Sequence, residues 1–454
     1  MNDAGDRRGE HRLIEDRLGT RARVFGSEQA ILAAVDPGVD GDLSASMREL
    51  ESLADTAGIP TLATVAQKRK RPDPATFLGK GKIGEVRRAA DELGADVVIF
   101  NDELSPAQAR NLEEVLARKV IDRTQLILDI FAQRAATKEA KLQVELAQLR
   151  YLLPRLRGWG SALTRTGGGI GTRGPGETQL ELDRFKVRRR IQGLERRLKK
   201  AASERSLRRQ RRAKSDLPQV ALVGYTNSGK STLLNRLCGV DSAVGDKLFA
   251  TLDTMVRRGP IDHGRQALFA DTVGFIRDLP HDLVPAFAAT LEAVRHADLI
   301  LHVIDRAANT WETDRQVVLE TLKGEVFRDG DAWPPVVSVL NKADAVSGFV
   351  EAEGDAVAIS AKRGNNVDAL LRRVESVLFP DDRTVDFLVP YASIGTFRGM
   401  TRPEQVEVLD HTTRGMKVRA RLSVAERGRL EAAGIEIGDG DREPDRRESR
   451  GSVA

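Results

Sequence analysis

Residues 224–231 read Gly224-Tyr225-Thr226-Asn227-Ser228-Gly229-Lys230-Ser231, and this stretch decides the fold of the chain around it. It follows the apolar run Val220 to Val223 and precedes a helical pattern that starts near Thr232. A glycine-rich loop between a buried strand and a helix is the setting in which this spacing indicates a phosphate-binding loop rather than a turn without function. Backbone N–H groups at the helix start would hold the α- and β-phosphates. Lys230 would reach the β- and γ-phosphates, and the Ser231 hydroxyl would bind Mg²⁺.

Four further motifs follow in the order and at the spacing of a guanine-nucleotide switch. They are Phe249-Ala250-Thr251, Asp271-Thr272-Val273-Gly274, Asn341-Lys342-Ala343-Asp344 and Ser360-Ala361-Lys362. Asp271 ends a predicted strand and can hold Mg²⁺ through water, and Gly274 would offer its N–H to the γ-phosphate. The Thr251 hydroxyl would complete the Mg²⁺ shell when a γ-phosphate draws its loop inward, which is an order–disorder switch. Thr254 is the alternative for that role, and either threonine could be a turn residue.

The Asn341 motif predicts the choice of base. The Asp344 carboxylate would accept two hydrogen bonds from guanine N1–H and N2–H₂, which adenine does not offer, so the site should discriminate against ATP. Ser360-Ala361-Lys362 would add a backbone contact to guanine O6. We predict catalytic roles for Lys230, Thr251 and Gly274, and Mg²⁺ ligation by Ser231 and Thr251. The predicted GTP-binding set comprises all five motifs, with the second extended to Phe249-Ala250-Thr251-Leu252-Asp253.

Composition excludes several other classes of protein. The single cysteine, Cys238, excludes a disulfide framework and a cysteine-based metal site, and the six histidines are scattered without ligand spacing. No stretch approaches the roughly 18 apolar residues of a membrane span. The polar N-terminus, Met1 to Glu10, lacks the apolar segment of a signal peptide. We therefore expect a cytoplasmic protein without a membrane span.

Basic residues concentrate between Arg184 and Lys214, although the net charge of the chain is only +5. Such a run is either a solvated helix face or a surface for a polyanion, and charge alone does not decide between the two.

The order of apolar runs predicts a multidomain α/β protein. Strands alternating with helices from Ala30 to Ile121 indicate a parallel α/β domain. Two leucine-rich stripes then predict an antiparallel helical hairpin; they are formed by Leu142, Leu146, Leu149 and Leu153 and by Val187, Ile191, Leu194 and Leu198. The connection 167–176 is glycine-rich, and we favour a phosphate- or backbone-binding loop over a flexible linker because it contains Arg173. Near-continuous apolar strands after Pro218 indicate a doubly wound parallel sheet.

These patterns divide the chain into six segments. We predict a disordered N-terminus at 1–24, an N-terminal α/β domain at 25–136 and a basic helical hairpin with its glycine-rich loop at 137–215. We then predict a GTP-binding domain (the G domain) at 216–379, a small C-terminal α+β domain at 380–437 and a disordered tail at 438–454.

Two other features are better explained by structure than by function. Gly79-Lys80-Gly81-Lys82 lacks phosphate-loop spacing and a directly preceding strand, so it is interpreted as a glycine-rich helix start. His302 lies within a predicted strand and is expected to be a core histidine rather than a catalytic base.

Beyond the nucleotide motifs, the chain resembles the HflX GTPases, a family of translation-factor-related P-loop GTPases. The resemblance covers roughly residues 25–425. It rests on the sequence from Gly167 to Glu181, on Phe249 to Asp253, on Asp271-Thr272-Val273-Gly274-Phe275-Ile276 and on Lys141 to Leu149. Of these, the glycine-rich segment is the most specific to the family.

The resemblance implies a cytoplasmic GTPase that uses Mg²⁺, binds the large (50S) ribosomal subunit and splits stalled or idle 70S ribosomes, often under heat or antibiotic stress. We expect the protein to be a monomer. It implies that the loop residues Gly167, Gly168, Gly169, Gly171, Arg173 and Gly174 contact ribosomal RNA. Phe275 stands where Ras-like proteins carry a water-positioning Gln, so we predict slow intrinsic hydrolysis that the ribosome stimulates. The alternatives are a GTP-sensing assembly or hibernation factor without splitting activity, and an ATP-driven RNA remodeller, against which Asp344 argues.

Overall fold

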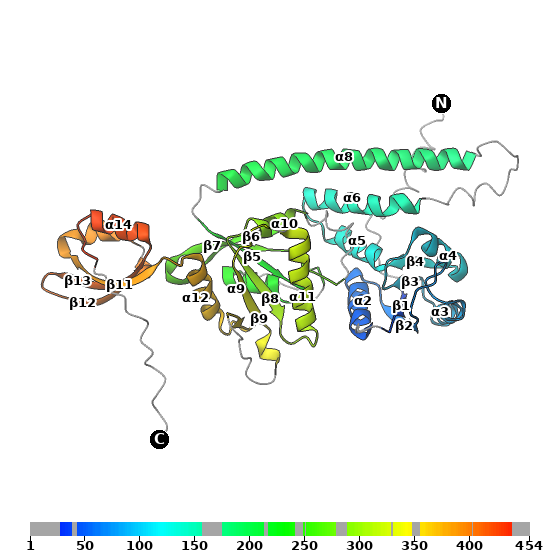
Figure 1. The fold of residues 1–454 in the computed structure, drawn as a ribbon, viewed down its shortest axis with the longest axis horizontal. Coiled ribbons are helices and arrows are strands. Elements are labelled where there is room, and N and C mark those ends of the chain that lie inside the picture. Colours follow the sequence, from blue (N-terminus) through cyan, green and yellow to red (C-terminus); the bar gives the residue numbers. More distant parts are fainter. Residues whose placement is uncertain are drawn as a thin grey trace, which may run out of the picture.

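The computed structural model describes residues 28–38, 43–156, 175–212, 217–240, 248–249, 251–277, 288–327, 330–346, 355–401 and 403–437. The segments predicted to be disordered, 1–24 and 438–454, lie outside these residues, as do Ala250 and the predicted RNA-binding positions from Gly167 to Gly174. Figure 1 shows two sheet domains side by side, a helical hairpin along one side of both, and a small sheet domain beyond the central one.

The N-terminal domain is a four-stranded parallel sheet with the order β2-β1-β3-β4. Its strands are β1 (Ala30–Asp36), β2 (Thr61–Lys68), β3 (Val97–Phe100) and β4 (Lys119–Asp122), and its helices are α2 (Leu43–Ala57), α3 (Lys80–Leu93), α4 (Pro106–Leu116) and α5 (Arg123–Arg134). Residues of α3 and α4 pack on one face of the sheet and residues of α2 and α5 on the other. The predicted parallel α/β domain is therefore confirmed. The start of α3 at Lys80 also confirms the glycine-rich helix start.

The hairpin consists of α6 (Lys138–Arg155) and the long helix α8 (Pro175–Arg212), which lie side by side in Figure 1. The two predicted stripes meet along its length, with Leu146, Leu149, Val187 and Leu194 buried between the helices. Arg150 pairs with Glu195 at 2.8 Å and Arg190 with Glu145 at 2.7 Å. The antiparallel hairpin is thus held by an apolar seam with ion pairs beside it.

The G domain is a six-stranded sheet with the order β10-β9-β8-β5-β7-β6. Its strands are β5 (Gln219–Gly224), β6 (Met255–Pro260), β7 (Gln266–Asp271), β8 (Leu299–Asp305), β9 (Val336–Asn341) and β10 (Val357–Ala358). Its helices are α9 (Lys230–Cys238), α10 (Ala288–Arg295), α11 (Trp311–Thr321) and α12 (Val367–Leu378). Residues of α9 and α12 pack on one face of the sheet and residues of α10 and α11 on the other, as expected for a doubly wound fold.

One strand of this sheet was not anticipated from the sequence. β6 pairs antiparallel with β7 at the sheet edge, and Met255, Val256 and Arg258 on it are exposed. The strands of this domain were predicted from near-continuous apolar runs, which are typical of strands buried on both faces of a sheet. An edge strand that is open to solvent lacks that pattern. The sheet is therefore parallel with one antiparallel edge strand.

The C-terminal domain is a three-stranded antiparallel sheet with the order β11-β13-β12. It comprises β11 (Arg383–Pro390), β12 (Val406–His411), β13 (Gly415–Leu422), α13 (Ile394–Met400) and α14 (Val424–Ala432). Its own core includes Phe387, Phe397 and Val418. The small α+β fold expected after Pro380 is confirmed.

None of the helices in the described parts of the chain is both long and apolar enough to cross a membrane. His302 is buried in β8, and burial lowers the pKa of its imidazole to about 3, so it is a neutral core residue as predicted.

Candidate functional site

The phosphate-binding loop joins β5 to α9 at the carboxyl edge of the G-domain sheet. Gly229 has a φ of +92°, and a side chain there would place Cβ 2.2 Å from Asn341 Nδ2, so only glycine fits. The Lys230 ammonium is buried and donates to the carbonyls of Gly224 at 3.0 Å and Tyr225 at 2.7 Å. Burial lowers the pKa of Lys230 to about 8, which a bound anion would reverse.

Three side chains from different elements meet beside this loop. The Ser231 hydroxyl donates to Asp271 Oδ2 at 2.7 Å and lies 2.8 Å from Thr251 Oγ1. The other carboxylate oxygen of Asp271 is buried and has no hydrogen-bond partner within the described structure. Burial raises the pKa of Asp271. Hydroxyl and carboxylate oxygens around an unsatisfied buried oxygen are the donor set that Mg²⁺ prefers, so these residues fit the predicted metal.

Thr251, rather than Thr254, is the threonine that reaches this group. The Thr254 hydroxyl is buried without a hydrogen-bond partner in the described residues, whereas the Thr251 hydroxyl contacts Ser231. The structure therefore favours the first of the two threonines that the sequence left open.

The two motifs predicted to recognise the base are hydrogen-bonded to the phosphate loop through the Asn341 side chain. Asn341 Nδ2 donates to the Ser228 carbonyl at 2.9 Å, and Asn341 Oδ1 accepts from the Ala361 N–H at 3.0 Å. Asp344 lies at the same edge, where the Ser360 hydroxyl holds the pKa of its carboxyl below the ordinary value. Lys342 has a φ of +61° and pairs with Asp305 at 2.7 Å. The motifs at 341–344 and 360–362 are thus brought to the loop that starts at Gly224.

Gly274 and Phe275 continue from the end of β7 toward the phosphate loop. A Cβ on Gly274 would lie 2.8 Å from Thr226 Cα and 3.1 Å from Lys230 Nζ, so the backbone approaches the loop closely. The Phe275 backbone accepts from the Thr226 N–H at 2.8 Å. Its ring is buried among residues of α10 and α11. Phe275 therefore offers no polar group for orienting water.

Sequence reasoning missed the contacts that this site makes with the N-terminal domain. Phe249, Leu252, Val273 and Ile276 share one buried apolar cluster with residues of α2, α5 and α6. The Asp253 carboxylate, predicted to lie near the nucleotide, accepts hydrogen bonds from residues 136 and 137 at the start of α6. The available signal in the sequence was the apolar character of Phe249 and Leu252, on either side of Thr251.

A second set of contacts reaches the phosphate loop itself. The Tyr225 hydroxyl donates to Glu49 of α2 at 2.9 Å and accepts from the Arg277 N–H at 2.9 Å. Arg123 of α5 pairs with Glu49 at 2.7 Å and donates to the Arg277 carbonyl at 3.2 Å. Burial raises the pKa of the Glu49 carboxyl. The N-terminal domain thus contacts the phosphate loop at Tyr225 and the segment after Gly274 at Arg277.

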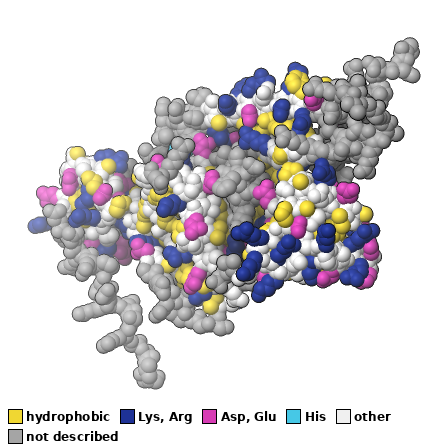
Figure 2. All heavy atoms as spheres, turned by 45° about the vertical axis from the view of Figure 1, so that its right-hand side comes forward, with side chains coloured by type: hydrophobic (Ala, Val, Ile, Leu, Met, Phe, Trp, Pro, Cys, Tyr) yellow, Lys and Arg dark blue, Asp and Glu magenta, His cyan; other side chains and the backbone are white. Residues whose placement is uncertain are grey.

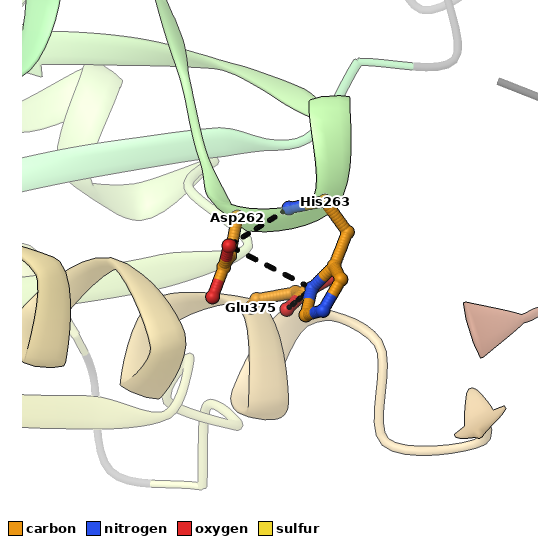
Figure 3. A group of neighbouring side chains, drawn as sticks. All are labelled: Asp262, His263 and Glu375. Carbon is orange, nitrogen blue, oxygen red and sulfur yellow. Dashed lines mark hydrogen bonds and ion pairs between the residues drawn. The ribbon is translucent and has the colours of Figure 1, made fainter. Parts of the chain in front are cut away.

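A separate polar cluster lies where the G domain meets the C-terminal domain, and Figure 3 shows its three members. His263 Nδ1 lies 2.9 Å from Glu375 and 3.8 Å from Asp262. Glu375 is fully buried, and guanidinium nitrogens of Arg421 and Arg265 lie 3.5 and 3.9 Å from its oxygens. Two cations already compensate the carboxylate, so the cluster is interpreted as a charged joint between domains rather than a metal site.

Comparison with known proteins gives matches along most of the chain. Residues 44–132 match the family model described as GTP-binding GTPase N-terminal, residues 134–212 match GTP-binding GTPase Middle Region, and residues 219–342 match 50S ribosome-binding GTPase. A GTPase HflX from Caldanaerobacter subterraneus is 45% identical over 89% of this chain and 93% of its own length. The GTPase HflX of Escherichia coli K12 is 49% identical over 72% of this chain and 76% of its own length.

Among solved structures, a GTP-binding protein of Sulfolobus solfataricus in complex with GDP is 25% identical, with a TM-score of 0.42. The alignment covers 77% of this chain and 98% of that one.

Proposed function

The chain belongs to the HflX family of GTPases and hydrolyses GTP, and from this premise we propose that it is a Mg²⁺-dependent switch that acts on the large ribosomal subunit. The observation that carries the switch is the meeting of Thr251 with Ser231 and Asp271. Thr251 belongs to a loop, whereas Ser231 lies in the first turn of α9 and Asp271 at the end of β7, so a bound γ-phosphate and its metal ion would link the loop to the fixed part of the site.

The five nucleotide motifs take the following roles in this proposal. Ser231 and Thr251 hold Mg²⁺, which neutralises charge on the β- and γ-phosphates when bound. Lys230 contacts the same phosphates, and the Gly274 N–H is directed to the γ-phosphate. Asp344 selects guanine, because its ionised carboxylate accepts from two base donors and stays ionised at neutral pH.

The partner is proposed to be ribosomal RNA of the large subunit. Exposed cations line the free side of α8, namely Arg188, Arg189, Arg196, Arg197, Lys199 and Lys200. A second exposed group lies on β2, the loop after it and α3, formed by Lys68, Lys70, Arg71, Lys80, Arg87 and Arg88. Figure 2 shows dark blue side chains gathered over the N-terminal domain and the hairpin. Phosphate contacts from such surfaces give binding that weakens as salt rises.

Ribosome binding is proposed to accelerate turnover. The buried Phe275 ring cannot orient an attacking water, so the free protein should hydrolyse GTP slowly. The subunit would supply or order the missing group. We further propose that the protein acts in the cytoplasm as a monomer. We also propose that its domain boundaries lie near residues 136, 215 and 379.

Sedimentation of 70S ribosomes with the protein and a non-hydrolysable GTP analogue tests the proposed role. Dissociation into subunits is expected if the protein splits ribosomes. Binding to large subunits without dissociation of 70S particles would refute splitting and leave an assembly or hibernation role. Failure to co-sediment with any ribosomal particle at low salt would refute the ribosomal partner altogether. An Arg188→Gln, Arg189→Gln variant should bind more weakly and with a shallower salt dependence.

A further inference from the structure

The loop that carries Thr251 is held from outside the G domain. We propose that Phe131 and Thr137 are positioning residues for GTP hydrolysis, because they fix the loop on both sides of Thr251. This inference rests on the proposed Mg²⁺-binding role of Thr251. It goes further by assigning part of the GTPase site to the N-terminal domain and to the hairpin.

The first anchor is apolar and lies two residues before Thr251. The Phe249 ring is 2% exposed and packs edge-to-face on Phe131 of α5, with ring centroids 4.8 Å apart at 87°. Phe249 adopts a φ of +52°, a conformation that bulky residues rarely take. Burial of the ring against α5 offsets this unfavourable backbone, so loss of the contact should release the loop.

The second anchor is polar and lies two residues after Thr251. The Asp253 carboxylate accepts from the N–H groups of Ala136 and Thr137, each at 3.0 Å, and from the Thr137 hydroxyl. The Thr137 oxygen in turn accepts from the Ala140 N–H at 3.1 Å and caps α6. A carboxylate at a helix N-terminus is favoured by both the free N–H groups and the helix dipole.

A backbone contact supports the same arrangement. The Leu248 N–H donates to the hydroxyl of Thr56, a buried residue of α2, at 3.2 Å. The described part of the loop is therefore fixed at Leu248, Phe249 and Asp253 by three helices that lie outside the G domain. Thr251 stands between these fixed points, and its hydroxyl is presented to Ser231.

An ordinary domain interface would also bury apolar side chains, but loss of its contacts would have a different effect on nucleotide binding. If the contacts only join domains, their loss lowers stability and affects all nucleotides alike. If they position Thr251, their loss reduces the fraction of molecules with a competent loop, and apparent affinity falls by that fraction. Only the affinity for GTP with Mg²⁺ would then fall, because this ligand is proposed to contact Thr251. GDP has no γ-phosphate that would bring this loop to the nucleotide.

The test compares full-length variants that differ in where they disturb the N-terminal domain. Phe131→Leu weakens the first anchor. Phe100→Leu is its matched control, since Phe100 is equally buried and makes an edge-to-face pair with Phe77 on the opposite face of the same sheet. Thr137→Val removes the hydroxyl of the second anchor, and Thr137→Ser restores it. The measurements are affinities for GDP and for a non-hydrolysable GTP analogue across a Mg²⁺ titration.

Phe131→Leu and Thr137→Val should weaken binding of the Mg²⁺-loaded analogue by about threefold to tenfold, the effect of a lost contact or hydrogen bond, and leave GDP binding within about twofold. Phe100→Leu and Thr137→Ser should keep the wild-type ratio of the two affinities. An unchanged ratio in Phe131→Leu and Thr137→Val, or an equal change in Phe100→Leu, would overturn the inference. If analogue binding by the wild type does not depend on Mg²⁺, the proposed function itself fails, which is a separate outcome.

Discussion

Asn341→Ala should uncouple the phosphate loop from the base-recognition loop. The Asn341 amide bridges the Ser228 carbonyl and the Ala361 N–H, at 2.9 and 3.0 Å. All three residues are at most 2% exposed, so water does not replace the lost partners without a rearrangement. The substitution therefore leaves one acceptor and one donor without these hydrogen bonds.

The magnitude follows from those two groups. A buried polar group that loses its partner costs about 1–3 kcal/mol, so the pair costs about 2–6 kcal/mol. Since about 1.4 kcal/mol corresponds to a factor of ten, the range is roughly 30-fold to 10⁴-fold in affinity. Both loops border the nucleotide site and can open to water in the free protein. We therefore expect the lower end, a GDP affinity weaker by about 30-fold.

Titration with a fluorescent GDP analogue measures this effect, and thermal denaturation verifies that the variant is folded. Asn365→Ala is the matched control, because Asn365 is exposed in the neighbouring loop and contacts Ser360 through its backbone carbonyl. The control should bind GDP like the wild type. A folded Asn341→Ala variant with wild-type GDP affinity would refute the reasoning that this amide joins the two loops.

Three further predictions concern the base, the lysine and the domain joint. Asp344→Asn should lose the preference for guanine and gain binding of xanthosine nucleotides, and competition titrations that still favour GTP would exclude its assigned role. Because burial lowers the pKa of Lys230 to about 8 from 10.5, the free protein loses this charge as pH rises through 8. GDP binding near pH 8.5 should therefore take up a proton and weaken at higher pH, and stability without nucleotide should rise between about pH 8 and 10.5. Calorimetric titrations that give equal heats in buffers of different protonation enthalpy would contradict this. Glu375→Gln breaks a buried ion pair with Arg421 and should lower the free energy of unfolding by about 3 kcal/mol; an unchanged urea-unfolding midpoint would count against the joint.

That the candidate nucleotide motifs lie together could be predicted from the sequence, because each motif has a local pattern of its own. Ser231, Asp271 and Asn341 each follow an apolar run that forms a strand of one sheet. The carboxyl ends of parallel strands meet at the same edge, so motifs far apart in the chain are brought together by a rule of the fold. The hairpin could also be predicted from a local pattern, because each of its two helices carries an apolar stripe that must be buried against another element.

The contacts of the loop around Thr251 could not be predicted in this way. Phe249 and Asp253 were predicted to bind the nucleotide as members of the motif from Phe249 to Asp253, yet the Phe249 ring packs on α5 and the Asp253 carboxylate binds the start of α6. The hydrogen bond between Asp253 and Thr137 spans 116 residues of sequence. A single pair of contacts at that separation leaves no periodic pattern, and domain packing rather than local preference decides it.

The rate of GTP hydrolysis with and without purified 50S subunits tests the central claim most directly. The buried Phe275 ring and the basic faces of α8 and the N-terminal domain predict slow hydrolysis by the free protein and a large, salt-sensitive increase with 50S subunits. Equal rates under both conditions, with the protein shown to bind GTP, would contradict the account.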